Sequence, residues 1–424
     1  MRRPKPGPGL LERPGTSLSP ETVASLAARA LEGATRGYRI CGRILRLRTD
    51  SREYARAFAE AFRRLAADGV DARGEGPHGR PLSELTFLTR EAGPDGFPAL
   101  LDPALSRARV FAHEEVEPTQ LFFALAFLEG RMFPLPDHAV LHASTLERDG
   151  EVTAVVGRSH SGKTTLGLAL ALEPGARFLS DEFCPVRLAD GAVEPFPRAL
   201  GLRRRTRALL AARGALDPAV AADARDDLTL DPLDVPGLTL GRGGGRVRNV
   251  ICVAGEAGEP VPEGVRDLDL EFVDDSVLAD LRAVPGVRAV APRPEPVAVG
   301  RAVRVAVEPG ARVSEALVRV CTERHGMQIC YVLPPGARRP DFTRPPELRP
   351  MSTLAGLTEL LRHFANAKAL GDQLGGATYP RLLDCLARVL GGARFFALRP
   401  GPLDDTVRLV RERVQGMGAG AAAS

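Results

Sequence analysis

One stretch of this chain, Val152–Glu182, constrains the fold more than any other. Residues 157–164 read GRSHSGKT, which is the pattern G-x-x-x-x-G-K-T. An apolar strand-like run (VTAVV) comes directly before the pattern, and an apolar helix-like run (LGLALAL) follows it. Glycines let backbone amides turn toward phosphate oxygens, and the start of a helix adds positive potential there. The stretch therefore predicts a phosphate-binding loop for a nucleotide, built on a strand–loop–helix unit.

The residue types of this loop suggest how it would bind. We expect Lys163 to reach the β- and γ-phosphates and the hydroxyl of Thr164 to ligate Mg²⁺. No guanine-specific N-K-x-D motif accompanies the loop. The expected nucleotide-binding residues are Gly157, Arg158, Ser159, His160, Ser161, Gly162, Lys163, Thr164 and Thr165.

The size and charge of the chain limit the alternatives. A length of 424 residues suits two or three domains. A net charge of +4 is small for this length and argues against a dedicated nucleic-acid binder. The basic N-terminus lacks the apolar core of a signal peptide, and no apolar run approaches the roughly 20 residues of a membrane span. We therefore expect a cytoplasmic protein with no membrane or nucleic-acid partner.

The first third of the chain predicts a small α/β domain. Residues 1–18 are rich in Pro, Gly and Arg and are expected to be a disordered tail. The domain itself would cover residues 19–135. Its predicted elements are a helix from Pro20, a strand over 38–48, a helix over 51–67, strands over 85–88 and 108–113, and a buried helix over 118–132.

The nucleotide domain is expected over residues 136–265. We predict a strand over 139–146, a hairpin turn at Asp149-Gly150, and the strand that enters the phosphate loop. After the loop and its helix, a strand over 176–179 ends at Ser180-Asp181-Glu182. Residues 336–415 would complete this domain, mainly with helices over 354–364, 379–389 and 404–413 and a strand over 394–398. The Gly/Ala-rich residues 416–424 are expected to be a second disordered tail.

The segment 266–335 has a different pattern. Predicted strands at 268–273, 287–291, 303–307 and 327–333 alternate with helices at 275–284 and 314–324. This βαββαβ order is that of a ferredoxin-like domain. We therefore predict a ferredoxin-like insertion in the nucleotide domain.

Three charged or polar groups near the loop are candidates for chemistry. Asp181 and Glu182 can divide two tasks, with Asp181 near the metal and either carboxylate accepting the proton of an acceptor hydroxyl. His142, one strand before the loop, could polarise the γ-phosphate or hold the carboxylates. The alternatives are a buried strand histidine for His142 and a solvated strand-end charge for Glu182.

A basic cluster follows the acidic pair. It could bind an acidic or phosphorylated substrate, or it could be a solvated helix face. Arg198 is the member that we keep as a candidate substrate contact, and we interpret the glycine-rich residues 241–246 as a linker. The cluster comprises Arg198, Arg203, Arg204, Arg205 and Arg207.

Four short motifs carry a resemblance to a known family. They are Leu141–Ser144 (LHAS), the loop at 157–164, Ser180–Glu182 (SDE) and Pro195–Arg198 (PFPR). At these residues the chain resembles the catalytic domain of HPr kinase/phosphorylase and its PEP-carboxykinase-like relatives, and above all the divergent HPr kinase-related members. The resemblance covers about residues 139–205, with a weaker match at Leu398–Gly401.

The resemblance implies a fold and an activity. The fold would be a PEP-carboxykinase-like P-loop core of the α/β class, and the ligands would be ATP and Mg²⁺. The activity would be transfer of the γ-phosphoryl group to a Ser or Thr hydroxyl of a protein or peptide, as in clusters for ribosomally made peptides. It places Lys163, His142, Asp181 and Glu182 in the catalytic set and Thr164 with Asp181 at the metal.

Other functions stay open at the level of sequence. The same core would suit a small-molecule kinase, for example one acting on free serine, or an ATP-binding regulatory protein without transfer. The bifunctional family members carry two aspartates where this chain has Asp181-Glu182, so HPr as substrate and reverse phosphorolysis are disfavoured. The resemblance also implies a homo-oligomer.

Overall fold

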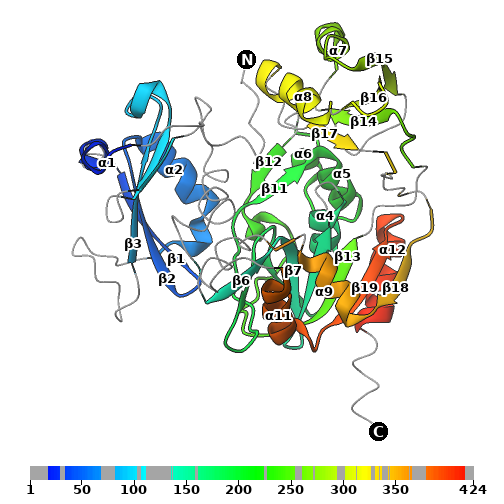
Figure 1. The fold of residues 1–424 in the computed structure, drawn as a ribbon. Coiled ribbons are helices and arrows are strands. Elements are labelled where there is room, and N and C mark those ends of the chain that lie inside the picture. The colour runs from blue at the N-terminus through cyan, green and yellow to red at the C-terminus, as the bar shows by residue number, and fades with distance from the viewer. Residues whose placement is uncertain are drawn as a thin grey trace. The chain divides into compact units, whose positions relative to one another are not determined.

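The computed structural model shows a mixed α/β protein whose chain divides into two compact units. The larger unit contains the described residues up to Val253 and from Pro345 onward, and the smaller unit lies between them in the chain. Figure 1 shows the elements of each unit. The structure describes residues 18–28, 34–67, 82–102, 107–110, 135, 137–157, 161–223, 227–253, 260–270, 273–293, 301–311, 313–325, 330–333, 335–336, 342, 344–361, 363–364 and 379–415.

The N-terminal part of the larger unit is a five-stranded sheet in the order β1-β2-β3-β4-β5 with two helices. Helix α2 begins after Ser51, whose side chain accepts a hydrogen bond from the amide of Tyr54. The aromatic side chains Phe58 and Phe62 of this segment are buried against the sheet. The elements are α1 (Pro20–Ala28), β1 (Ala34–Ile40), β2 (Arg43–Thr49), α2 (Arg52–Ala61), η1 (Arg63–Leu65), β3 (Leu82–Leu88), η2 (Pro94–Gly96), β4 (Ala99–Asp102) and β5 (Arg107–Val110).

The prediction of a single strand over 38–48 is wrong. The chain turns at Cys41-Gly42, where both residues have positive φ, so β1 and β2 form a hairpin. The alternation of apolar and polar residues continues through the turn and hid it. The helix predicted over 118–132 lies outside the described residues.

The centre of the larger unit is a six-stranded sheet in the order β18-β19-β13-β8-β7-β9. Strands β19, β13 and β8 are parallel to one another, while β7 is antiparallel to both β8 and β9. The carboxyl ends of β19, β13, β8 and β9 therefore lie along one edge. The strands are β7 (Ala143–Arg148), β8 (Glu151–Gly157), β9 (Ala176–Ser180), β13 (Arg246–Val253), β18 (Glu347–Met351) and β19 (Arg394–Arg399).

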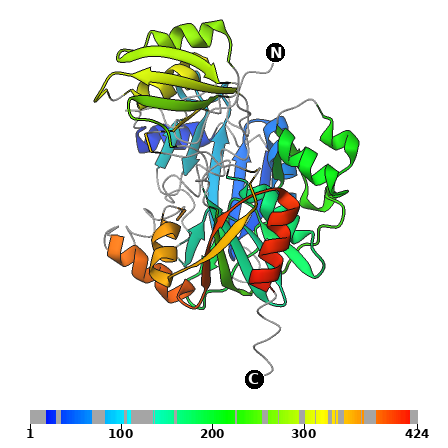
Figure 2. The same cartoon turned by 90° about the vertical axis from the view of Figure 1, so that its right-hand side faces the viewer.

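Helices cover both faces of this sheet, and the side chains of β8 alternate between the two faces. Ala154 and Val156 join the apolar core under α9 and α11. Val155, which lies between them, instead joins the core under α4, α5 and α12. Figure 2 shows α9 and α11 on one side of the strands and α12 on the other. The helices are α4 (Lys163–Ala171), α5 (Arg204–Ala212), α9 (Thr353–Leu361), α11 (Tyr379–Leu390) and α12 (Leu403–Val410).

The prediction of one strand over 139–146 is also wrong, and the difference matters for the site. The segment breaks at His142 into β6 (His138–Leu141), which pairs with β10 (Cys184–Arg187), and β7, which belongs to the central sheet. The predicted Asp149-Gly150 turn is confirmed, since both residues have positive φ and join β7 to β8.

Several elements of the larger unit were not predicted from the sequence. Strand β13 supplies a central strand, and β18 supplies an edge strand. Strands β11 and β12 form a separate antiparallel pair, and β11 leads into helix α5. These additional elements are β11 (Leu200–Arg203), α6 (Pro218–Ala221), β12 (Asp227–Leu230) and η4 (Pro232–Asp234), whereas η6 (Arg411–Gln415) continues the helix predicted over 404–413.

The smaller unit is a four-stranded antiparallel sheet in the order β15-β16-β14-β17. Helices α7 and α8 contribute to its own apolar core, which includes Leu268, Leu281, Val303 and Leu317. The elements are β14 (Val265–Leu270), α7 (Asp275–Arg282), β15 (Val287–Arg293), β16 (Arg301–Val307), α8 (Ser314–Arg319), η5 (Val320–Arg324) and β17 (Cys330–Leu333). Among all the described residues, no helix is long and apolar enough to cross a membrane.

Candidate functional site

The candidate site lies at the edge where β8, β13 and β9 end. The strand register brings the ends of these strands and the start of β7 together. Val253 at the end of β13 pairs with Gly157 at the end of β8, and Ala143 at the start of β7 pairs with Val156. His142, the residue before Ala143, therefore lies beside the end of β8. On the other side of β7, Thr145 pairs with Ser180, the residue before Asp181.

The glycines of the loop are required by close contacts and by backbone conformation. A Cβ atom on Gly157 would lie 2.7 Å from Oγ of Ser161 and 3.0 Å from the carbonyl oxygen of Val253. Gly162 has φ of +93°, a conformation that favours glycine, and α4 begins at the next residue. Residues Arg158, Ser159 and His160 of the predicted loop lie outside the described residues.

Ser161 shows that the loop has unused hydrogen-bonding capacity. Its side chain is buried, and its Oγ has no hydrogen-bond partner among the residues that the structure describes. A buried hydroxyl without a partner is unfavourable, and an oxygen of a bound phosphate would supply one. This residue fits the predicted anion site.

Lys163 begins helix α4 and is buried. Burial lowers the pKa of its ammonium group, and the carboxylates of Glu182 and Asp181 oppose that shift. A buried cation at the start of a helix, beside two carboxylates, is placed to bind an anion that reaches the end of the loop.

Thr164 and Asp181 contact each other directly. The hydroxyl of Thr164 lies 2.9 Å and 3.1 Å from the two carboxylate oxygens of Asp181 and donates to them. Burial, with the nearby charge of Glu182, raises the pKa of Asp181 to about 6. A buried carboxylate and a hydroxyl side by side are oxygen ligands of the kind that Mg²⁺ takes, so this pair fits the metal.

The described residues contain no group of three or more His, Cys, Asp and Glu side chains arranged for a metal ion. A site with few protein ligands suits Mg²⁺, which usually keeps several waters and is held by one or two carboxylates together with substrate phosphates. Thr164 and Asp181 are the residues that would provide the protein side of such a site.

Glu182 has an unusual backbone conformation and forms an ion pair with Arg198. Its φ is +67°, which is uncommon for a residue other than glycine and is often found at functional sites. Its carboxylate lies 2.5 Å from the guanidinium of Arg198, whose side chain is buried. The structure thus places the predicted substrate contact Arg198 against Glu182.

His142 lies at the break between β6 and β7 and is half-buried. Its backbone amide donates to the carbonyl oxygen of His363 over 2.7 Å. Burial, followed by the nearby charge of Lys163, lowers the pKa of the His142 imidazole to about 4. The side chain is therefore neutral at pH 7, so it can donate one hydrogen bond without adding charge.

The sequence did not reveal two residues near His142. His363 is buried, and its Nε2 lies 3.6 Å from a carboxylate oxygen of Glu359 on α9. Glu359 also acts electrostatically on Cys252 at the end of β13. Neither residue belongs to a motif, and both are far from His142 in the chain, so no local pattern could have indicated them.

The predicted basic cluster does not gather at one place. Arg207 is fully buried and donates to the carbonyl oxygen of Asp223, whereas Arg204 and Arg205 are exposed on α5. The hydroxyl of Thr165, at the start of α4, lies 2.9 Å from the hydroxyl of Thr206 in α5. This contact connects α5 to the phosphate-loop helix.

Comparisons with known proteins add little to this geometry. No family model matches the chain, and no curated protein matches it. Among solved structures, the chain is similar to the structure of the Hpr(Ser) kinase/phosphatase from Coxiella burnetii, with 13% identity. The similarity covers 44% of this chain and 95% of that chain with a TM-score of 0.15, which is too low to bear on fold or function.

Proposed function

We propose that this protein is an ATP- and Mg²⁺-dependent kinase that transfers the γ-phosphoryl group to a hydroxyl. The observation that carries the proposal is the contact of Thr164 with the buried carboxylate of Asp181, next to Lys163 at the end of the loop between Gly157 and Gly162. Phosphoryl transfer from a metal-bound nucleotide uses a hydroxyl and a carboxylate to hold the metal and a cation to bind the phosphates.

The loop and the first turn of α4 would hold the nucleotide. Lys163 would bind the β- and γ-phosphates, and a phosphate oxygen would give the hydroxyl of Ser161 a partner there. Thr164 and Asp181 would hold Mg²⁺. When bound, this ion would neutralise part of the negative charge of the phosphates.

The acidic pair would then divide two tasks. Asp181 contacts Thr164, so we assign it to the metal side. Glu182 is about one-third exposed, and Arg198 fixes its direction, so we assign it to the acceptor side. In the transfer, the acceptor oxygen bonds to the γ-phosphorus, the bond to the β,γ-bridging oxygen breaks, and Glu182 takes the hydroxyl proton.

His142 and the fold complete the proposal. A neutral His142 beside Gly157 can donate a hydrogen bond to a γ-phosphate oxygen. We interpret the larger unit as a PEP-carboxykinase-like P-loop core with a smaller N-terminal α/β part. The order of strands in the smaller unit, with helices α7 and α8, supports a ferredoxin-like module.

The acceptor is proposed to be a Ser or Thr of a protein or peptide, in the cytoplasm. This choice rests on the motifs LHAS, SDE and PFPR, which contain His142, Asp181, Glu182 and Arg198. A free amino acid such as serine would fit the same chemistry and is an outcome of the test.

The test follows γ-labelled ATP with purified protein, Mg²⁺ and extract of the native host. We expect label to move to a Ser or Thr of a polypeptide, and to be lost in Lys163→Ala. Glu182→Gln should lower kcat by about 100-fold or more with little change in nucleotide affinity. Label on a small molecule would reassign the acceptor, and tight ATP binding without transfer would replace the kinase by a nucleotide-regulated protein.

A further inference from the structure

The exposed side of α2 carries a groove that the proposed chemistry does not use. Its volume is about 490 Å³, and its lining includes Arg52, Arg56 and Arg63 together with small alanines. Arg52 and Arg56 are four residues apart on α2 and so lie on one side of the helix, and Arg63 follows in η1, after α2 has ended at Ala61. The groove therefore has a floor of small apolar residues with arginine side chains beside it.

The charges of this groove are largely uncompensated. Arg52 and Arg56 are exposed, and neither forms an ion pair with another residue that the structure describes. Arg63 lies 3.8 Å from Asp231, and Glu60 is the single acidic residue in the described lining. With Arg63 paired to Asp231, the exposed guanidinium groups of Arg52 and Arg56 still outnumber the one carboxylate in the described lining, Glu60, and this net positive charge favours an acidic occupant.

The far end of α2 is joined to the candidate site. The carbonyl oxygen of Ala61 accepts a hydrogen bond of 2.8 Å from the amide of Ala199, the residue after Arg198. The ring of Phe62 lies 6.4 Å from that of Phe196, which in turn lies 4.5 Å from the ring of Phe183 beside Glu182. The groove and the Arg198–Glu182 pair thus share one packed segment.

Arg64 strengthens the same connection. Its Nε lies 3.0 Å from both carboxylate oxygens of Asp231, which is buried and belongs to the phosphate-loop part of the unit. A buried carboxylate that binds a guanidinium holds η1, the segment directly after α2, in a fixed position. A polypeptide bound along α2 would therefore lie at a defined place relative to Glu182.

We propose that the α2 groove docks an acidic segment of the polypeptide acceptor and so brings its hydroxyl to Glu182. This inference rests on the proposed kinase function and names the class of its substrate. At the rise of a helix, Arg52 and Ala61 at the two ends of α2 are separated by about 14 Å. An extended peptide covers that length with about four residues.

The experiment measures binding without nucleotide, so it does not depend on catalysis. The probe is a fluorescein-labelled peptide of alternating Asp and Glu followed by Gly-Ser-Gly, and the readout is fluorescence anisotropy. We expect Arg52→Glu with Arg56→Glu to weaken binding by at least about tenfold, because two attractive charges become repulsive. Arg52→Lys with Arg56→Lys should keep most of the affinity, which shows that charge is the cause.

Arg413→Glu is the matched control, since Arg413 is exposed on η6 and lies outside the groove. It should leave the affinity for the acidic peptide unchanged within about twofold. Equal affinity of wild type and the Arg52/Arg56 variant would overturn the proposal, and so would the absence of binding to wild type.

A second readout separates this proposal from the kinase itself. In the labelled-ATP assay, the Arg52/Arg56 variant should raise KM for the polypeptide acceptor and leave kcat unchanged. Peptide binding without any phosphoryl transfer would keep the docking site and reject the kinase. Transfer with an unchanged KM would keep the kinase and reject the docking site.

Discussion

At the scale of single residues, Gly167 lets α4 pack very closely on β7. A Cβ atom on Gly167 would lie 2.1 Å from Oγ and 2.6 Å from Cβ of Ser144, whose side chain is fully buried. Only glycine lets the helix approach the strand this closely. The position of Lys163 and Thr164 at the start of the same helix depends on that approach.

Gly167→Ala should therefore destabilise the protein. Because neither the strand nor the helix can shift freely, we expect a loss of about 2–3 kcal/mol in the free energy of unfolding. Denaturant titration measures it. The control is Gly201→Ala in β11, where a Cβ atom would meet nothing within 4 Å, and a loss as large as that of Gly167→Ala would contradict the account.

Asp181 makes stability depend on pH. The pKa of Asp181 is about 6 in the folded protein, above the usual value of about 3.9 in an unfolded chain. Above pH 6 the carboxylate is ionised in both states, and its burial opposes folding. Between pH 6 and pH 4 the folded state takes up the proton first, so this penalty disappears as the pH falls.

Asp181→Asn, without Mg²⁺ or nucleotide, should therefore raise the melting temperature at pH 8 by about 2–6 °C. The advantage should shrink to near zero at pH 4, as measured by thermal melts across that range. Asp149→Asn at the exposed turn is the control and should show no such trend. An advantage that does not change with pH would reject the burial argument.

The site residues differ in how far the sequence could predict them. Lys163, Thr164 and Asp181 lie within one strand–loop–helix–strand stretch, so local pattern sufficed to place them together. Arg198 was expected at a substrate, but the structure pairs it with Glu182. His363 and Glu359 reach the site through tertiary packing of α9, which local periodicity does not report.

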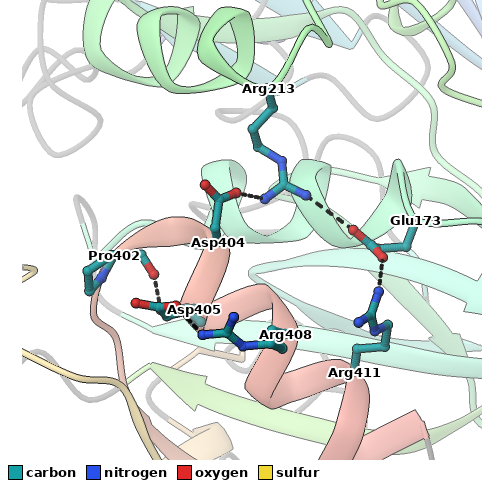
Figure 3. A network of polar contacts seen from close by, with 8 residues as sticks. Glu173, Arg213, Pro402, Asp404, Asp405, Arg408 and Arg411 are labelled. Atoms are coloured by element: carbon teal, nitrogen blue, oxygen red, sulfur yellow. Dashed lines mark hydrogen bonds and ion pairs between the residues drawn. The ribbon is translucent and has the colours of Figure 1, made fainter.

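At the scale of elements, a charged network joins the end of α4 to α12, as Figure 3 shows. Glu173 lies 3.1 Å from Arg213 at the end of α5 and 3.1 Å from Arg411 after α12. Arg213 also pairs with Asp404 in the first turn of α12. One mostly buried carboxylate thus holds two arginines from different elements.

Glu173→Gln should weaken this network, because both arginines lose their shared negative partner. We expect a loss of about 1–2 kcal/mol in the free energy of unfolding, measured by denaturant titration. Arg408→Ala removes an exposed pair with Asp405 in the same region and serves as the control. It should cost less than about 0.5 kcal/mol, and equal losses in both variants would contradict the assignment.

Elements with a clear hydrophobic period, including the four strands of the smaller unit, were predicted near their observed positions, whereas the β1–β2 turn and strand β13 were missed. The turn between β7 and β8 agrees with its predicted position, and α2 begins near its predicted start but ends at Ala61 rather than at residue 67. The β1–β2 hairpin was missed because alternation runs through its turn, and β13 was missed because its first residues follow a glycine-rich stretch. In both cases the partner strand, which the sequence does not identify, decides the structure.

At the scale of the whole molecule, the smaller unit is inserted at a short gap in the larger one. Val253 pairs with Leu398, and Leu398 pairs with Leu348 on β18. Two strand spacings, about 10 Å, therefore separate Val253 from Leu348, which lies a few residues after the insertion. A linker of a few residues can cover that distance.

Replacing residues 254–344 with a short Gly/Ser linker should leave a folded protein that binds Mg·ATP with unchanged affinity, within about twofold. The reason is that each unit has its own apolar core. Circular dichroism and calorimetry check the fold and the affinity. Loss of folding or of nucleotide binding in the shortened chain would show that the smaller unit supports the site.

We propose that the edge formed by β8, β9 and β13 binds Mg·ATP. Isothermal titration calorimetry of the full chain with ATP and Mg²⁺ measures this binding, with Lys163→Ala and the control Arg413→Ala. We expect binding that requires Mg²⁺, is at least about tenfold weaker in Lys163→Ala and is unchanged in the control. Equal affinity in wild type and Lys163→Ala, or no binding at all, would contradict it.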